Sequence, residues 1–108
     1  ANATGTLISS SQTAHASQTK ASGVVIYKNN EGTATLNTDL KMYFSCDGGS
    51  NFTQSTMTAA GTFSTGILMA KAPEVTCTAG TAIQYKLVFA NQSSGSKETQ
   101  IHAVGMNY

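Results

Sequence analysis

A chain of 108 residues has room for one domain with one hydrophobic core. Six lysines, no arginine and five acidic residues give a formal charge of +1, which lacks the basic surface that binding to nucleic-acid phosphates requires. Only 10% of the residues are charged while Ser and Thr are abundant, a balance that is atypical of cytosolic enzymes and that suits extracellular or assembled proteins.

The N-terminal region shows neither a membrane segment nor a targeting segment. No apolar run approaches the roughly 20 residues of a membrane span, so we expect no membrane insertion. The first 22 residues are polar and lack the charged start and apolar middle of a secretory signal. A start at Ala1 fits either a cleaved segment or removal of an initiator Met. We expect the second, because Ala1 opens directly onto a strand-like segment and one domain then fills residues 1–108.

Most segments alternate apolar and polar residues and are bounded by Gly, Asn, Asp or Ser, which predicts short antiparallel strands. In chain order the expected strands are residues 5–10, 23–27, 39–46, 51–58, 66–71, 74–78, 82–89 and 99–106. Turns are expected at residues 29–32, 47–49, 60–61, 79–80 and 93–96. Pro73 stands just before an expected strand, where its missing N–H does least harm.

Two of these strands have a clear apolar face. It is formed by Leu40, Met42, Phe44 and Cys46 in the first, and by Ile83, Tyr85, Leu87 and Phe89 in the second. Residues 23–27 are apolar on both faces, which predicts a central strand or a strand against a neighbouring chain. About eight strands in one small domain predict an all-β fold, a single antiparallel β-sandwich of jelly-roll-like type. An immunoglobulin-like sandwich is the alternative, although the chain has no Trp for the core of such a domain.

Residues 45–52 read SCDGGSNF and fit the pattern Ser-x-Asp-x-Gly-x-x-Phe. This pattern resembles the Asp box, a short hairpin motif of sialidases and of many unrelated secreted β proteins. The resemblance implies a structural hairpin and no catalytic role. Ser45 and Asp47 would hydrogen-bond the turn backbone, Gly49 would take a positive φ, and Phe52 would pack beneath the hairpin.

A calcium loop with Asp47 and Asn51 as ligands is the alternative for this stretch. It lacks the alternating acidic residues and the terminal Glu of a dedicated calcium loop, so no metal site is predicted. His15 and His102 stand apart from any zinc-ligand spacing. The chain also has no Gly-x-Ser-x-Gly elbow and no indicated carboxylate pair. We therefore expect no enzyme activity and no cofactor.

Cys46 and Cys77 are the only cysteines, and both lie in strand-like stretches near turns. Neighbouring strands could bring them within disulfide range. A bond would close a loop of about thirty residues and stabilise the fold by roughly 3 to 4 kcal/mol on the chain-entropy model. Two buried free thiols are the alternative.

Carbohydrate binding is a second functional hypothesis, because sandwich domains often present aromatic rings and amides to sugars. The chain has no Trp to stack on a pyranose ring. The aromatic side chains that look free to contact a glycan are Tyr27, Tyr43 and Tyr108.

Several stretches together resemble small β-domains of tailed bacteriophages, especially marine ones, that occur alone or at the ends of virion fibre proteins. The similarity spans almost the whole chain and is carried by residues 3–9, 22–29, 32–40, 91–99 and 105–108. Such domains often have a Trp in the hairpin after Asp-Gly-Gly, where this chain has Phe52. The pair Cys46 and Cys77 is particular to this sequence.

The resemblance implies a virion structural protein, either a capsid decoration protein or a fibre component, found outside the cell after host lysis. A nearly neutral surface would let copies pack side by side without strong repulsion. A chain this short has a marginal core, and association would hide residual apolar faces such as Val25 and Val88. We expect a homo-oligomer, with a trimer favoured, or a surface array templated by the capsid, bound in either case to other virion proteins. The alternative is a module at a fibre tip that binds a cell-surface receptor or glycan.

Overall fold

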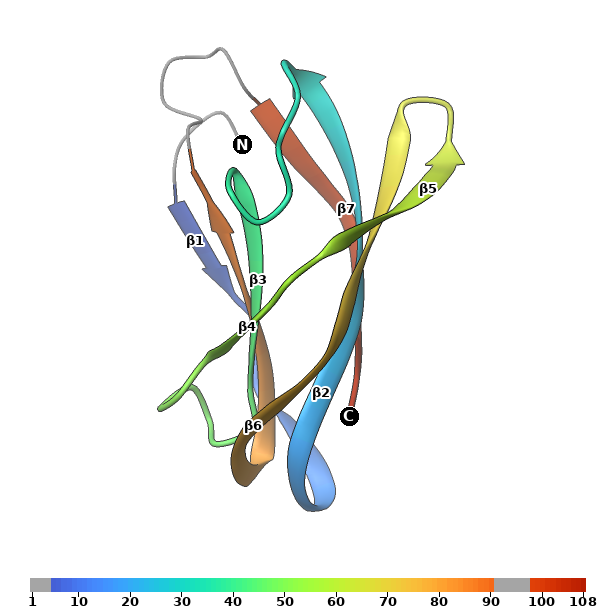
Figure 1. Ribbon diagram of the computed structural model, residues 1–108. Helices are drawn as coiled ribbons and strands as arrows, with labels where there is room; N and C mark the ends of the chain where they lie inside the picture. Colours follow the sequence, from blue (N-terminus) through green and yellow to red (C-terminus); the bar gives the residue numbers. More distant parts are fainter. Residues whose placement is uncertain (1–4, 91–97) are drawn as a thin grey trace.

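The computed structural model describes residues 5–90 and 98–108, and these form one antiparallel β-sheet of seven strands with no helix (Figure 1). The predicted all-β antiparallel fold is confirmed. The predicted turn at residues 93–96 lies outside the described residues. The strands are β1 (Gly5–Ile8), β2 (Gln12–Glu31), β3 (Leu40–Ser45), β4 (Thr53–Ser55), β5 (Thr58–Ser64), β6 (Ile67–Phe89) and β7 (Glu98–Asn107).

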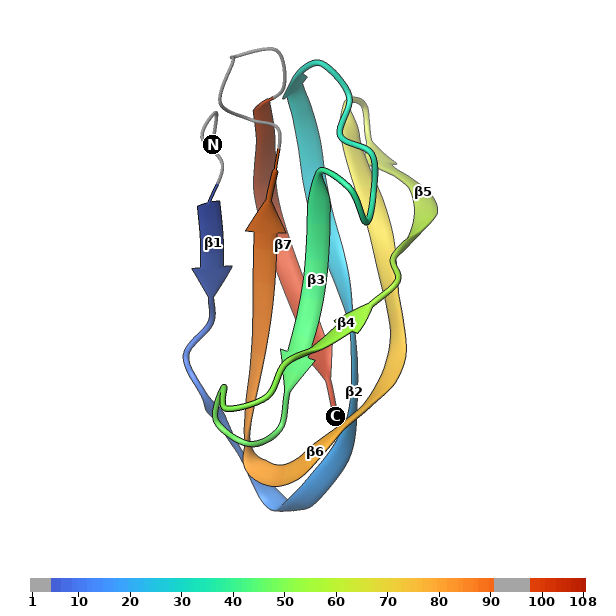
Figure 2. The ribbon, with the colours of Figure 1, turned by 60° about the vertical axis from the view of Figure 1, so that its left-hand side comes forward.

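Strand β6, which has 23 residues, organises the sheet. Its residues 67–83 pair with β2 and β5, and its residues 84–89 pair with β1 and β3. Strand β7 pairs with the other edge of β2, so β2, β5, β7 and residues 67–83 of β6 form one group of strands. Strand β4 pairs with β3, so β1, β3, β4 and residues 84–89 of β6 form the second group. Figure 2 shows β1, β3 and the end of β6 in front of β2 and β7, so the single sheet folds over along β6.

The described residues form seven strands and not eight, because three expected strands are joined into one and β5, for which no strand was predicted beyond Thr58, is added. Three expected strands merge into β6, and the polar residues 12–22, for which no strand was predicted, form the first part of β2. The expected break at Pro73 is a bulge inside β6, where the register with β2 shifts between Ala21 and Gly23. The turn expected at residues 60–61 lies inside β5, and β2 continues into the turn expected at residues 29–32.

The turn expected at residues 79–80 is also part of β6, at the point where the strand bends (Figure 1). A Cβ atom on Gly80 would overlap the carbonyl oxygen of Cys46 and would lie 2.9 Å from the Cα atom of Asp47. The lack of a side chain at Gly80 therefore lets β6 pass directly against the end of β3.

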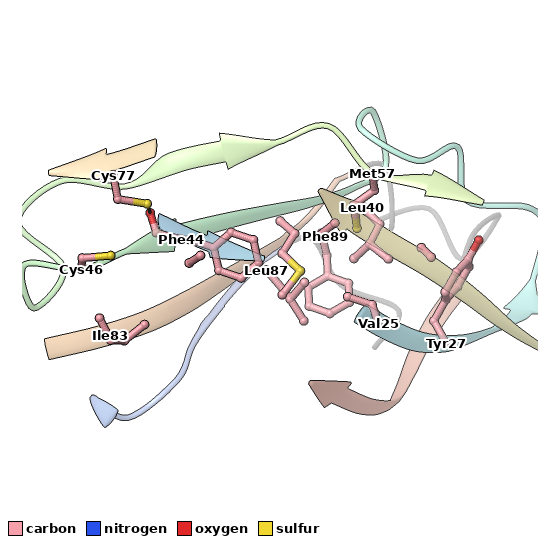
Figure 3. Close-up of a cluster of buried hydrophobic side chains, with 14 of the residues drawn as sticks. Val25, Tyr27, Leu40, Phe44, Cys46, Met57, Cys77, Ile83, Leu87 and Phe89 are labelled. Carbon is pink, nitrogen blue, oxygen red and sulfur yellow. Dashed lines mark hydrogen bonds between the residues drawn. The ribbon is translucent and has the colours of Figure 1, made fainter. Parts of the chain in front are cut away.

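One hydrophobic core lies between the two groups of strands (Figure 3). The apolar faces predicted for β3 and for the end of β6 are confirmed, and Tyr85 is their only half-buried member. A Cβ atom on Gly23 in β2 would lie 3.0 Å from Phe44 and 3.1 Å from Met42, both in β3. The two groups thus meet in close contact. The fully buried side chains of the core include Val25, Leu40, Met42, Phe44, Cys46, Ile83 and Leu87.

Strand β2 lies centrally, as its apolar residues predicted, but the prediction that Val25 forms a residual apolar face is wrong. Val25 is fully buried because it points into the core, and Val88 is half-buried. The outward face of this part of β2 is instead formed by Val24, which is 39% exposed, and by the half-buried Ile26.

Candidate functional site

The turn after β3 is held together by the hydroxyl group of Ser45. This hydroxyl is buried, donates a hydrogen bond to Oδ1 of Asp47 (2.7 Å) and accepts one from the backbone N–H of Gly49 (3.0 Å). Gly48 and Gly49 have φ angles of 77° and 89°, the left-handed region that favours glycine. The backbone N–H of Gly48 also donates to the carbonyl oxygen of Ala82 (3.0 Å), which ties the turn to β6.

The carboxylate of Asp47 accepts hydrogen bonds from the other side of the turn. Asn51 donates its side-chain Nδ2 to Oδ2 (2.7 Å) and its backbone N–H to Oδ1 (3.0 Å). The side-chain bonds from Asn51 and from Ser45 lower the pKa of Asp47 from 3.8 to about 2. The carboxylate is therefore ionised at neutral pH and acts as an acceptor for the turn.

The calcium alternative finds little support in this geometry. Both carboxylate oxygens of Asp47 already accept hydrogen bonds within the turn, and the amide nitrogen of Asn51 is bound to one of them. Within residues 5–90 and 98–108, no three His, Cys, Asp or Glu side chains are grouped closely enough to hold a metal ion. His15 and His102 are exposed and lie on β2 and β7.

Phe52 lies on the outer surface of the sheet and does not enter the core. Its ring is half-buried, and a Cβ atom on Gly49 would lie 3.6 Å from it. The Nζ atom of Lys86 lies 4.5 Å from the centroid of the Phe52 ring and 4.4 Å from that of Tyr43. The two rings thus hold the lysine ammonium group by cation–π contacts across β3 and β6.

Cys46 and Cys77 are both buried and both free thiols (Figure 3). The Sγ atom of Cys77 donates to the carbonyl oxygen of Phe44 at 3.7 Å. Burial, followed by the neighbouring Cys77, raises the pKa of Cys46 to about 11. Because the thiolate is the reactive form, Cys46 is poorly reactive at neutral pH, and the disulfide stays a prediction.

The three tyrosines proposed as glycan contacts lie in different environments. The prediction for Tyr27 is wrong, because only 4% of this residue is exposed and burial raises the pKa of its hydroxyl. Tyr43 is half-buried against Lys86. Tyr108 is 47% exposed and lines a hollow of about 130 Å³ that Gln18 and Lys20 also line. The structure does not bring the three rings together.

Sequence reasoning missed an open groove of about 550 Å³ on the outer face of β2, β6 and β7. Val24 and Gly105 face it, Pro73 and Glu74 line it from β6, and Asn107 lines it from β7. Its residues come from three segments that are far apart in the chain, so only the strand pairing could have revealed it. The sequence signal that was present is the run 23–27, which is apolar on both faces.

Comparisons with protein families, with curated proteins and with solved structures give no match for this chain. Within the residues that the structure describes, there is no helix with the length and apolar character needed to span a membrane. The candidate functional features are therefore the outer groove, the hollow beside Tyr108 and the two buried thiols.

Proposed function

We propose that this chain is a non-enzymatic structural protein of a tailed-bacteriophage virion, either a capsid decoration protein or a fibre component. In this role it associates with itself and attaches to other virion proteins, and the sequence analysis favoured a trimer. The observation that carries the proposal is the open groove beside the exposed Val24. An apolar surface of this kind on a small domain is typical of a protein contact.

The remaining features of the chain are consistent with this role. The formal charge of +1 and the 10% content of charged residues allow copies to pack closely. We also propose that the folded sheet is a jelly-roll-like β-sandwich, since the two groups of strands share one core. We place the protein in the virion, outside the cell after lysis, without nucleic-acid or membrane contacts of its own.

The experiment is to purify phage particles by density gradient from lysed cultures that encode the chain. Mass spectrometry of the particle band then tests for the chain. We expect it to band with the particles in a fixed ratio to the major capsid protein or to a fibre protein. A chain that stays entirely in the soluble lysate would contradict the proposal.

Glycan binding at a fibre tip is the second candidate, and the exposed ring of Tyr108 supports it. Tyr108 and Gln18 both line a surface hollow, where an aromatic ring and an amide could stack on a sugar and hydrogen-bond to its hydroxyl groups. The amide nitrogen of Gln18 also donates to the carbonyl oxygen of Ala16 (3.2 Å). A glycan array should detect binding that Tyr108→Ala removes. The matched control is Phe63→Ala, which removes another exposed ring, on β5. Equal binding by both variants would place any glycan site elsewhere.

A further inference from the structure

We propose that the outer face of β2 and β7 is a contact between two copies of this chain, which meet face to face about a two-fold axis between these strands. The inference rests on the self-association in the proposed function and names its surface and geometry. It favours a pair of chains over the trimer expected from the sequence.

The strand register places large and small side chains beside one another on this face. Val24 pairs with Gly105 and Ile26 pairs with Ala103, and paired residues of neighbouring strands point to the same side of a sheet. Val24 is 39% exposed, whereas a Cβ atom on Gly105 would meet no other atom within 4 Å. Within the groove, the Val24 side chain of β2 therefore stands as an apolar ridge, and Gly105 of β7 forms a lower step beside it.

A ridge beside a step is complementary to a second copy of itself. An axis that runs parallel to the strands, between β2 and β7, brings β2 of each copy over β7 of the other. Val24 of one copy then fills the open space above Gly105 of the other, and Ile26 lies over Ala103. This is the isologous contact of a two-fold dimer, in which one surface patch meets itself.

The polar residues of the same face follow the same geometry. Ser22 pairs with Asn107, one outward position further along the two strands. The same axis places the hydroxyl group of Ser22 opposite the side-chain amide of Asn107 in the other copy, where each can donate to the other. The apolar contact is thus continued by a pair of hydrogen bonds, and no charge of these two strands is buried between residues 22 and 26 or 103 and 107.

The contact is small, so the expected association is weak. Two neighbouring strands of ten residues cover roughly 300 Å², well below the about 800 Å² that each partner of a standard interface buries. We expect a dimer that forms at high concentration in solution. On a particle, attachment of neighbouring copies to the same surface raises their effective concentration, so the same weak contact forms more readily.

The test is sedimentation equilibrium of the purified chain over a series from micromolar to millimolar concentrations. We expect a monomer–dimer equilibrium whose dissociation constant rises about tenfold or more in Val24→Lys and in Gly105→Leu. The Cβ atom of Gly105→Leu would meet no other atom within 4 Å, and the position faces outward, so the fold is expected to persist. The matched controls are Ile8→Lys and Gly5→Leu, because Ile8 is 52% exposed and Gly5 also has open space around its Cβ position.

A second measurement tests the orientation of the two copies. When Ser22→Cys and Asn107→Cys chains are mixed, a short bismaleimide should link one chain of each kind. Linkage should be several-fold lower when Val24→Lys is added to both chains. Links that form only between identical chains would contradict the two-fold axis between β2 and β7.

The outcomes separate this inference from the proposed function. An oligomer of any size that is unaffected by both groove variants, or equally affected by the controls, would overturn the inference and leave self-association standing. A chain that stays monomeric at every concentration would overturn both the dimer contact and self-association in solution.

Discussion

At the scale of single residues, Asp47 is the acceptor that joins the two sides of the turn after β3. Its pKa is about 2 in the folded chain against an ordinary value of 3.8, since Asn51 and Ser45 donate hydrogen bonds to the ionised form. Its stabilising contribution is therefore complete above about pH 4 and is lost as the pH falls toward about 2.

We expect Asp47→Asn to lower the melting temperature at neutral pH and to flatten its decline between these two pH values. Thermal unfolding monitored by circular dichroism over this pH range measures both effects. Glu74→Gln is the control, because Glu74 is an exposed carboxylate whose ion pair with Lys20 is also exposed. If the Asn51 and Ser45 hydrogen bonds contribute nothing, Asp47→Asn will show the same pH profile as the parent chain.

Gly80 is the residue that allows β6 to cross the end of β3. A Cβ atom there would overlap the carbonyl oxygen of Cys46, so backbone must move. We expect Gly80→Ala to lower the free energy of unfolding by about 1 to 3 kcal/mol, the usual cost of overpacking. Gly105→Ala is the matched control, since its Cβ atom meets nothing within 4 Å and should leave stability unchanged or slightly higher. Urea denaturation of both variants measures the difference in the free energy of unfolding. Equal stabilities would show that a Cβ atom at residue 80 fits between β6 and the end of β3.

At the scale of the strands, Cys46 and Cys77 lie where a bond would fasten β3 to the first part of β6. Formation of the bond transfers two electrons and two protons from the thiols to an oxidant such as oxidised glutathione. We expect the folded chain to react slowly, because both thiols are buried and the pKa of Cys46 is about 11. Refolding with oxidised and reduced glutathione should instead form the bond.

The bonded form should be more stable than the reduced form by roughly 3 to 4 kcal/mol. Intact-mass measurement detects the loss of two hydrogen atoms, and urea denaturation of the two forms gives the stability difference. Cys77→Ser should show no intramolecular bond and no gain. A bond that forms without any gain in stability would indicate that closing it strains the native strands.

The sequence predicted those strands whose two faces differ in polarity. Strand β3 and the end of β6 were found because every second residue is apolar and buried. The start of β2 was missed, since its small and polar side chains form no such pattern and its pairing with β6 alone makes it a strand. Pro73 and Gly80 suggested breaks in the chain, but they occur at a bulge and at a bend within one long strand.

Of the candidate sites, too, the sequence indicates those built from residues close together in the chain and misses those built by strand pairing. The bonds of the turn at Asp47 join residues two to four positions apart, so the local spacing of SCDGGSNF is enough to indicate them. The groove depends on the pairing of β2 with β6 and β7, which no local pattern contains. A run that is apolar on both faces also leaves open which face is inside. For this reason Val25 and Tyr27 were expected to be available at the surface, whereas Val24 is the exposed residue.

At the scale of the whole molecule, β6 belongs to both groups of strands, and one core lies between them. Neither group of strands can therefore unfold without exposing the apolar face of the other group. We expect the described part of the chain to unfold as one cooperative unit.

The substitution Leu40→Ala tests this cooperativity. Leu40 is fully buried in β3, so its truncation should lower the free energy of unfolding by about 2 to 5 kcal/mol. In native-state hydrogen exchange, the most protected amides of β2 should lose the same free energy of protection as those of β3, although β2 is in the other group. Phe63→Ala, at a position that is 63% exposed on β5, should change protection by less than about 0.5 kcal/mol. Amides of β2 that keep their full protection in Leu40→Ala would show that the two groups unfold independently, in spite of the strand they share.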